Sequence, residues 1–222
     1  AARDKLPSQA TSQRDDLTAR AQAELAAAQA AAEEVVRLAR SRMSNLPKPT
    51  SPESTPDVAS EREQLKLRRQ EARFLIAKLM FEKAKTEPPG SDARTEQLAA
   101  AGEAFQALFV EFENSLVGFY GRLYEGRCYQ EAGDYDRALP CFRDLLEVNT
   151  NNAAFRALMA QALRSRIETL MAQGKLKEAI EDGQRWLAES RPNERTESDW
   201  LGVSFRLAEA LLARRDELPP GD

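Results

Sequence analysis

Apolar residues recur at steps of three and four along most of this chain, and glycines and prolines stand in the gaps between such segments. This spacing predicts amphipathic helices separated by short breaks. In chain order the pattern predicts a long helix over about 11–44, helical hairpins over about 60–114, 116–149 and 153–190, and a last helix over 197–214. The expected fold class is therefore all-α.

The first predicted helix is alanine-rich and carries a narrow apolar stripe over about nine turns. Alanine favours helix but buries little area, so this segment needs a partner helix or the rest of the chain to pack against. A solvated helix with frayed ends is one alternative, and a homo-oligomer formed through residues 11–44 as a coiled coil is another. We assign residues 1–46 to this N-terminal arm. Its stripe consists of Leu17, Ala21, Leu25, Ala28, Ala32, Val35, Ala39 and Met43.

A proline-rich stretch follows the arm, with four prolines among serines and threonines over residues 47–59. Such a composition is typical of an extended linker without a core of its own. Ser60 and Glu63 have the spacing of a capping box, which predicts that the next helix begins at residue 60. We expect the domain boundary here, with a repeat domain over 60–217.

The stretch 119–149 has small residues where two helices would cross and large ones beside them. Gly126 and Ala138 lack bulk, so the helices can approach closely there. Gly133 can adopt the left-handed conformation that ends the first helix, and Asp134 can cap the second. The pattern consists of Gly126, Tyr129, Gly133, Tyr135, Ala138, Phe142 and Leu145.

These residues resemble the tetratricopeptide (TPR) repeat, a helix–turn–helix unit that stacks with its neighbours. Ala101, Phe105 and Leu108 repeat the pattern one hairpin earlier, and Ala179 repeats that of Ala138 one hairpin later. Gly183 replaces the aromatic residue in this third unit, where we expect Trp186 to fill the space. The resemblance implies a TPR-like right-handed superhelix of about three hairpins plus a C-terminal capping helix, preceded by the long N-terminal helix. It also suggests a bacterial source.

The composition argues for recognition rather than catalysis. The chain has no histidine, which removes the commonest general base and metal ligand, and its serines and glycines form no nucleophile elbow or phosphate loop. We therefore expect no enzyme activity, no cofactor and no metal. The net charge of −4 gives no basic footprint for nucleic acid, and no apolar run is long enough for a membrane span.

Cys128 and Cys141 lie on either side of the predicted turn at Gly133. They are too few for a disulfide framework, so the sequence allows either one bridge or two buried thiols. The compartment stays open between the cytoplasm and the bacterial periplasm.

The resemblance implies a protein–protein interaction scaffold that holds a peptide or helix of a partner on the concave surface formed by the first helix of each hairpin. Arginine, glutamine and tyrosine there suit a partner with a carboxylate or an aromatic side chain. Leu123 and Arg127 depart from the lysines and asparagines that chaperone-binding members use to clamp a terminal carboxylate. The alternative function is structural self-assembly or cell-envelope assembly through the arm. The implied groove residues are Tyr120, Leu123, Arg127, Gln130, Glu131, Gln161, Arg164, Glu168 and Met171.

Overall fold

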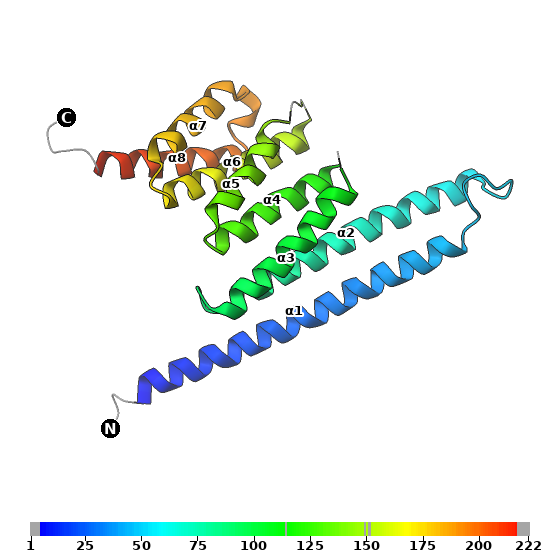
Figure 1. The fold of residues 1–222 in the computed structure, drawn as a ribbon. Helices are drawn as coiled ribbons and strands as arrows, with labels where there is room; N and C mark the ends of the chain where they lie inside the picture. The colour runs from blue at the N-terminus through cyan, green and yellow to red at the C-terminus, as the bar shows by residue number, and fades with distance from the viewer. Residues whose placement is uncertain (1–4, 114, 149, 151, 217–222) are drawn as a thin grey trace. The chain divides into compact units, whose positions relative to one another are not determined.

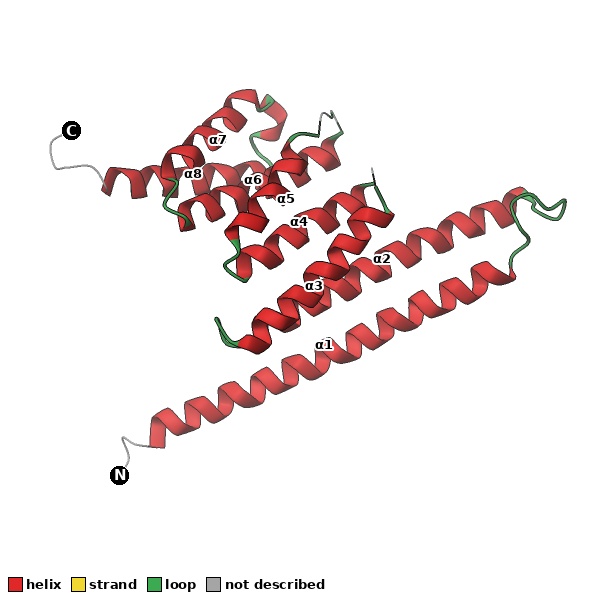
Figure 2. Ribbon diagram, viewed as in Figure 1, coloured by secondary structure: helices red, strands yellow, loops and turns green. Residues whose placement is uncertain are grey.

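The computed structural model describes residues 5–113, 115–148, 150 and 152–216, and all regular structure within these ranges is helical (Figures 1 and 2). The chain divides into two compact units, residues 1–104 and 105–222. The all-α fold expected from the sequence is confirmed. The elements are α1 (Lys5–Asn45), α2 (Pro56–Thr86), α3 (Asp92–Glu111), α4 (Leu116–Glu131), α5 (Tyr135–Leu146), α6 (Ala153–Ala172), α7 (Leu176–Glu189), the 3₁₀ turn η1 (Pro192–Glu194) and α8 (Ser198–Asp216).

The first unit is built on a long antiparallel pair, α1 and α2, which lie side by side (Figure 1). Between residues 12 and 46, every position shielded from solvent falls on one heptad-spaced line. Steps of three and four that repeat every seven residues are the spacing of a coiled-coil seam. We call this line the inner seam of α1; it consists of Thr18, Gln22, Leu25, Gln29, Ala32, Val36, Ala39, Met43 and Leu46.

Polar contacts at both ends of this helix pair hold its register. Gln22 Nε2 donates to Thr86 Oγ1 at 2.9 Å and to Glu87 Oε1 at 3.0 Å. At the loop end, the Arg62 guanidinium donates to the carbonyl oxygens of Leu46 and Pro47. The seam is therefore mixed: apolar residues share it with Thr18, Gln22 and Gln29, and Gln22 is paired with the end of α2.

The predicted apolar stripe of the arm was half wrong. Leu25, Ala32, Ala39 and Met43 belong to the inner seam, but the other members of that stripe are exposed to solvent. The exposed members are Leu17, Ala21, Ala28 and Val35. Apolar character alone selected them, whereas the packed face also uses threonine and glutamine.

Helix α2 begins at Pro56, four residues before the expected start at Ser60. The Thr55 hydroxyl caps it by accepting a hydrogen bond from the Val58 backbone N–H at 3.3 Å. Proline fits the first helical position because its missing N–H would have no partner there. The loop between α1 and α2 is therefore shorter than the linker predicted from composition.

In the second unit, the α4–α5 hairpin has the turn that the sequence predicts. Gly133 has a φ of 77°, and the Asp134 carboxylate accepts from the Arg137 backbone N–H at 3.2 Å. Helices α4 and α5 cross closely at Gly126. A Cβ at that position would lie 2.6 Å from Phe142 Cε1, so any larger residue would push the helices apart.

Among the residues that the structure describes, two apolar clusters lie in the second unit. One lies among α4, α5 and α6 and includes Leu123, Phe142 and Leu145. The other lies among α6, α7 and α8 and includes Ile167, Trp186 and Val203. Trp186 is buried as expected, one turn after the glycine that replaces the aromatic residue.

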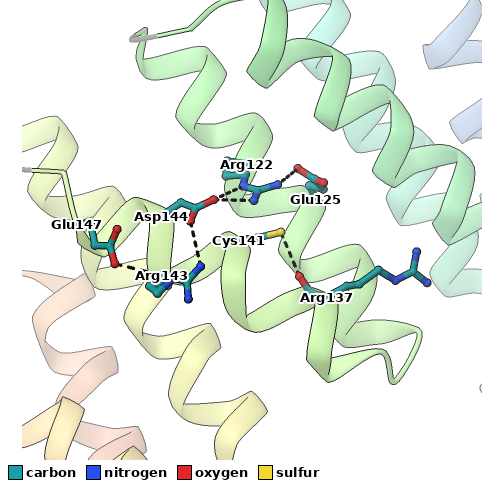
Figure 3. A network of polar contacts seen from close by, with 7 residues as sticks. All are labelled: Arg122, Glu125, Arg137, Cys141, Arg143, Asp144 and Glu147. Carbon is teal, nitrogen blue, oxygen red and sulfur yellow. Dashed lines mark hydrogen bonds and ion pairs between the residues drawn. The ribbon is translucent and has the colours of Figure 1, made fainter.

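A buried ion-pair network joins α4 to α5 (Figure 3). Arg122 donates to Glu125 Oε2 at 2.8 Å and to Asp144 Oδ2 at 2.6 Å, and the Glu125 side chain is only 2% exposed. Burial by itself lowers the pKa of Arg122, but its hydrogen bonds to the two carboxylates outweigh that effect and raise the pKa above its ordinary value. Arg122 thus compensates a carboxylate that has no access to water.

Cys128 and Cys141 are both buried free thiols, which settles the alternative that the sequence left open. Burial raises the pKa of both, that of Cys141 to about 12. The Cys141 thiol donates to the carbonyl of Arg137 one turn earlier (Figure 3). Both residues therefore act as small core side chains.

Candidate interaction surface

Helix α6 contacts α4 on one side and α8 on the other. Side chains of these three helices form a polar surface in the second unit. We call it the three-helix face. Each helix contributes side chains that reach those of the next helix. The face comprises Tyr120, Tyr124, Arg127 and Gln130 of α4, Gln161, Arg164 and Glu168 of α6, and Asp199, Gly202 and Arg206 of α8.

Aromatic side chains form one part of this face. The Tyr124 ring stacks on Phe105 with centroids 5.1 Å apart, and the Arg127 guanidinium lies 4.9 Å from the Tyr124 centroid. Tyr120 is hydrogen-bonded to Gln161. Burial raises the pKa of the Tyr120 phenol, and the nearby negative charge of Asp199 raises it further. The phenol is therefore a neutral group beside α8.

Two arginines converge at the middle of the face. Arg127 Nε donates to Ser165 Oγ at 3.3 Å, and burial lowers the pKa of Arg127, an effect to which the positive charge of Arg164 adds. Within the described residues, Arg164 has no carboxylate or hydrogen-bond partner. Gly202 leaves room for it, since a Cβ there would lie 3.3 Å from Arg164 Cδ and Nη1. Glu168 attracts the charge of Arg127, so the positive charge that lacks a carboxylate partner here is that of Arg164.

The far end of the face is neutralised internally. Gln130 Nε2 donates to Glu168 Oε2 at 3.3 Å, and Glu168 Oε1 accepts from Arg206 Nε at 2.6 Å. Arg206 also pairs with Glu209 at 2.6 Å. These contacts link all three helices and hold the side chains in place, and Glu168 also attracts Arg127, so Arg164 carries the charge that lacks an acidic partner among the described residues.

The residues predicted from the sequence are placed unevenly. Leu123 cannot contact a partner, because its side chain is fully buried against the α5 and α6 core. Met171 is half-buried against the α6–α8 cluster, and Glu131 is exposed at the end of α4. The other six predicted residues lie together on the three-helix face.

The contribution of α8 was missed, because its segment was interpreted only as a cap. Asp199, Gly202, Arg206 and Glu209 follow one another at steps of three and four. These residues form a polar line on the side of α8 opposite its apolar face. This line could have indicated that α8 contributes to the polar surface.

A pocket of about 280 Å³ lies where α6, α7, η1 and α8 meet, and it includes Asp199 from the three-helix face. Its wall is formed by alanines of α6 and by the indole rings of Trp186 and Trp200. The indole N–H groups of both tryptophans are buried and have no hydrogen-bond partner. Donors left in this state cost stability, so the region favours an added acceptor.

Arg156 forms the charged side of this pocket. Its guanidinium lies 4.3 Å from the centroid of Trp186 and donates two hydrogen bonds of 2.9 Å to the Glu194 carboxylate. Glu194 also accepts from the backbone N–H of Arg191. These hydrogen bonds, that of Arg156 above all, lower the pKa of Glu194 to about 2. The ion pair ties η1 to α6 and closes one end of the pocket.

Within the parts of the chain that the structure describes, no cluster of three or more histidine, cysteine or acidic side chains could hold a metal ion. A search of the same residues finds no helix with the length and apolarity required to cross a membrane.

Comparison with known families gives one result that bears on this surface. Residues 124–194 match the family model described as "Tetratricopeptide repeat". The matched range runs from Tyr124 in α4 through α5, α6 and α7 to η1, so it includes the α6 residues of the three-helix face and most of the α4 residues but none from α8. A search of curated proteins and a search of solved structures gave no match. Residues 124–194 are thus TPR-like within an all-α chain, and this likeness suggests a protein interaction scaffold.

Proposed function

We propose that this TPR-like chain holds an acidic peptide segment of a partner protein on the three-helix face, with a carboxylate bound between Arg127 and Arg164. One observation carries the proposal: Arg164 stands beside Arg127 with no acidic partner in the described chain. Two guanidinium groups that repel one another are both stabilised when an anion binds between them.

The surroundings of the arginine pair favour a peptide carboxylate over a bare ion. The partly exposed Tyr120 ring lies on the same face as the charges, and such a rigid side chain gives contact area at a small entropy cost. Gln161 adds an amide that can pair with a peptide backbone group. The site thus combines one charge-assisted contact with flat apolar area, as peptide-binding surfaces do.

The pocket beside Asp199 extends this site. A peptide that crosses α6 toward α8 can place an apolar side chain between Trp186 and Trp200. We therefore propose an acidic residue near an aromatic or aliphatic one as the recognised pattern.

Selection from a displayed peptide library, followed by titration of the best peptide, tests the proposal. We expect enrichment of peptides with an acidic residue or a free carboxyl terminus, and a loss of affinity of about 10- to 100-fold in Arg164→Gln, because a hydrogen bond to a charged group is removed. Arg185→Gln is the matched control, since Arg185 lies on α7 with its side chain 66% exposed. Enrichment of basic peptides, or equal affinity in both variants, would contradict the proposal.

A further inference from the structure

Helix α1 carries a second heptad-spaced line of residues, displaced by one position from the inner seam. Every member of it is exposed, including large apolar side chains: Leu17 is 64%, Leu38 52% and Val35 43% exposed. We call it the outer seam. It consists of Leu17, Ala21, Glu24, Ala28, Ala31, Val35 and Leu38.

The outer seam continues onto α2. Arg42 and Glu61 form an ion pair of 2.6 Å, which shows that their positions flank the same side of the antiparallel pair. Ala28 lies two heptads before Arg42 on α1, and Leu75 lies two heptads after Glu61 on α2. Because the two helices are antiparallel, Ala28 and Leu75 flank the same side of the pair as Arg42 and Glu61 do. Leu75 is 46% exposed, so the apolar strip is widest near its middle, where both helices contribute.

The pattern of the outer seam is close to a palindrome. Leu17 stands at one end and Val35 with Leu38 at the other, while alanines occupy most of the middle. A two-fold axis perpendicular to the helix brings opposite ends of the same sequence together. Leucine then meets valine or leucine of the second copy at both ends, and the small central residues let the helix axes approach closely.

Charges beside the seam favour the antiparallel arrangement. Arg20 and Glu34 lie on the outer edge of the seam, one heptad on either side of Ala27. Antiparallel pairing about Ala27 places Arg20 of one copy opposite Glu34 of the other, twice in the dimer. In a parallel pair, Arg20 and Glu34 would lie on the opposite side of the seam from the same residues of the second copy, so this attraction would be absent.

We propose that this chain forms an antiparallel homodimer through the outer seam of α1, with Leu75 of α2 at its centre. The occupant is a second copy because the strip is complementary to itself in both shape and charge. The α1–α2 pair then becomes part of a four-helix interface around the two-fold axis. This surface is separate from the three-helix face, so Arg164→Gln should leave the dimer unchanged.

Light scattering and sedimentation equilibrium of the full chain test the proposal. We expect twice the chain mass for the parent, and a monomer for Ala28→Arg, which places a bulky charge at the close approach. Ala30→Arg is the matched control, because Ala30 is also exposed but lies about 200° around the helix. Circular dichroism should show equal helix content in both. A monomeric parent, or an Ala28→Arg variant that stays dimeric, overturns the proposal.

Cross-linking tests the orientation independently. Arg20→Cys and Glu34→Cys are prepared as separate full-length chains; the native thiols Cys128 and Cys141 are buried. Under mild oxidation we expect disulfide-linked dimers when the two variants are mixed, and few when either is alone. No cross-link in the mixture, or self-cross-linking of the Arg20→Cys chain as efficient as that of the mixture, would overturn the antiparallel arrangement.

Discussion

At the scale of single residues, Arg122 and Glu125 show how a charge is kept inside a helical repeat. The Glu125 carboxylate is 2% exposed and sits where the two helices of the hairpin meet, so its charge is tolerable only while Arg122 neutralises it. Asp144 of α5 holds the other side of the guanidinium and makes the pair an interhelical link (Figure 3).

Replacing Arg122 with leucine should lower the free energy of unfolding by about 3–5 kcal/mol, because it leaves a buried carboxylate without a partner. Replacing Glu125 with leucine as well should restore part of that loss. Urea titration followed by circular dichroism measures both. Arg143→Leu is the control: Arg143 is 60% exposed, and its loss should cost under about 1 kcal/mol. Equal costs for the two arginines would show that Glu125 does not depend on Arg122.

The same scale shows where sequence reasoning stops. The crossing at Gly126, the left-handed Gly133 and the cap at Asp134 could all be predicted, because each depends on local geometry that one residue type satisfies. Leu123 could not be placed correctly from a repeat register. One turn of helix carries both surface and core positions. Only the packing of α5 and α6 against α4 shows that Leu123 is buried.

At the scale of elements, α1 shows a limit of apolar periodicity. Its alanines are spread around the helix, so two heptad-spaced lines are possible, and a stripe chosen by apolar character took residues from both. The helix packs on the line that contains Gln22 and Gln29, because Gln22 finds partners at the end of α2. Contacts with residues more than sixty positions later in the chain determine which side of α1 is packed. The periodicity of α1 alone does not contain that information.

The link between η1 and α6 gives a prediction at this scale. The folded pKa of Glu194 is about 2 against an ordinary value of 4.5, so its ion pair with Arg156 adds stability above pH 4.5 that is lost as the pH falls toward 2. At pH 7, Glu194→Gln should therefore be less stable than the parent by up to about 3 kcal/mol. The difference should shrink steadily between pH 4.5 and pH 2.

Urea unfolding at a series of pH values measures this effect. Glu147→Gln serves as the control, since Glu147 is 70% exposed and meets Arg143 only at 3.8 Å. A gap between Glu194→Gln and the parent that stays constant with pH would show that the loss comes from packing and not from the charge.

At the scale of the whole molecule, α8 covers the apolar side of the α6–α7 hairpin in the second unit. A stacked hairpin exposes an apolar side unless something covers it, and here Val203, Leu207 and Ala210 of α8 provide the cover. Leu207 lies against Gly183 of α7, where a Cβ would be 3.2 Å from its Cδ1. The terminal helix is therefore both the last element of the core and the third helix of the candidate surface.

Leu207→Ala should cost about 2–5 kcal/mol of stability, because it leaves a cavity against α7. Each hairpin in a stacked repeat is stabilised mainly by its direct neighbours. The loss of stability should therefore be larger in the helices that contact Leu207 than in the more distant hairpin. Hydrogen exchange by mass spectrometry should show faster exchange in α6, α7 and α8 than in the parent, with a smaller change in α4 and α5.

Leu201→Ala on the same helix is the control for this experiment, because Leu201 is 53% exposed and should change exchange little. If α4 and α5 exchange as fast as α7 in the Leu207→Ala chain, the second unit unfolds as one cooperative block. The three-helix face would then be lost together with its last helix. A graded response instead means that the proposed peptide binding at Arg127 can survive partial opening of α8. Titration of Leu207→Ala with the selected peptide would detect such binding directly.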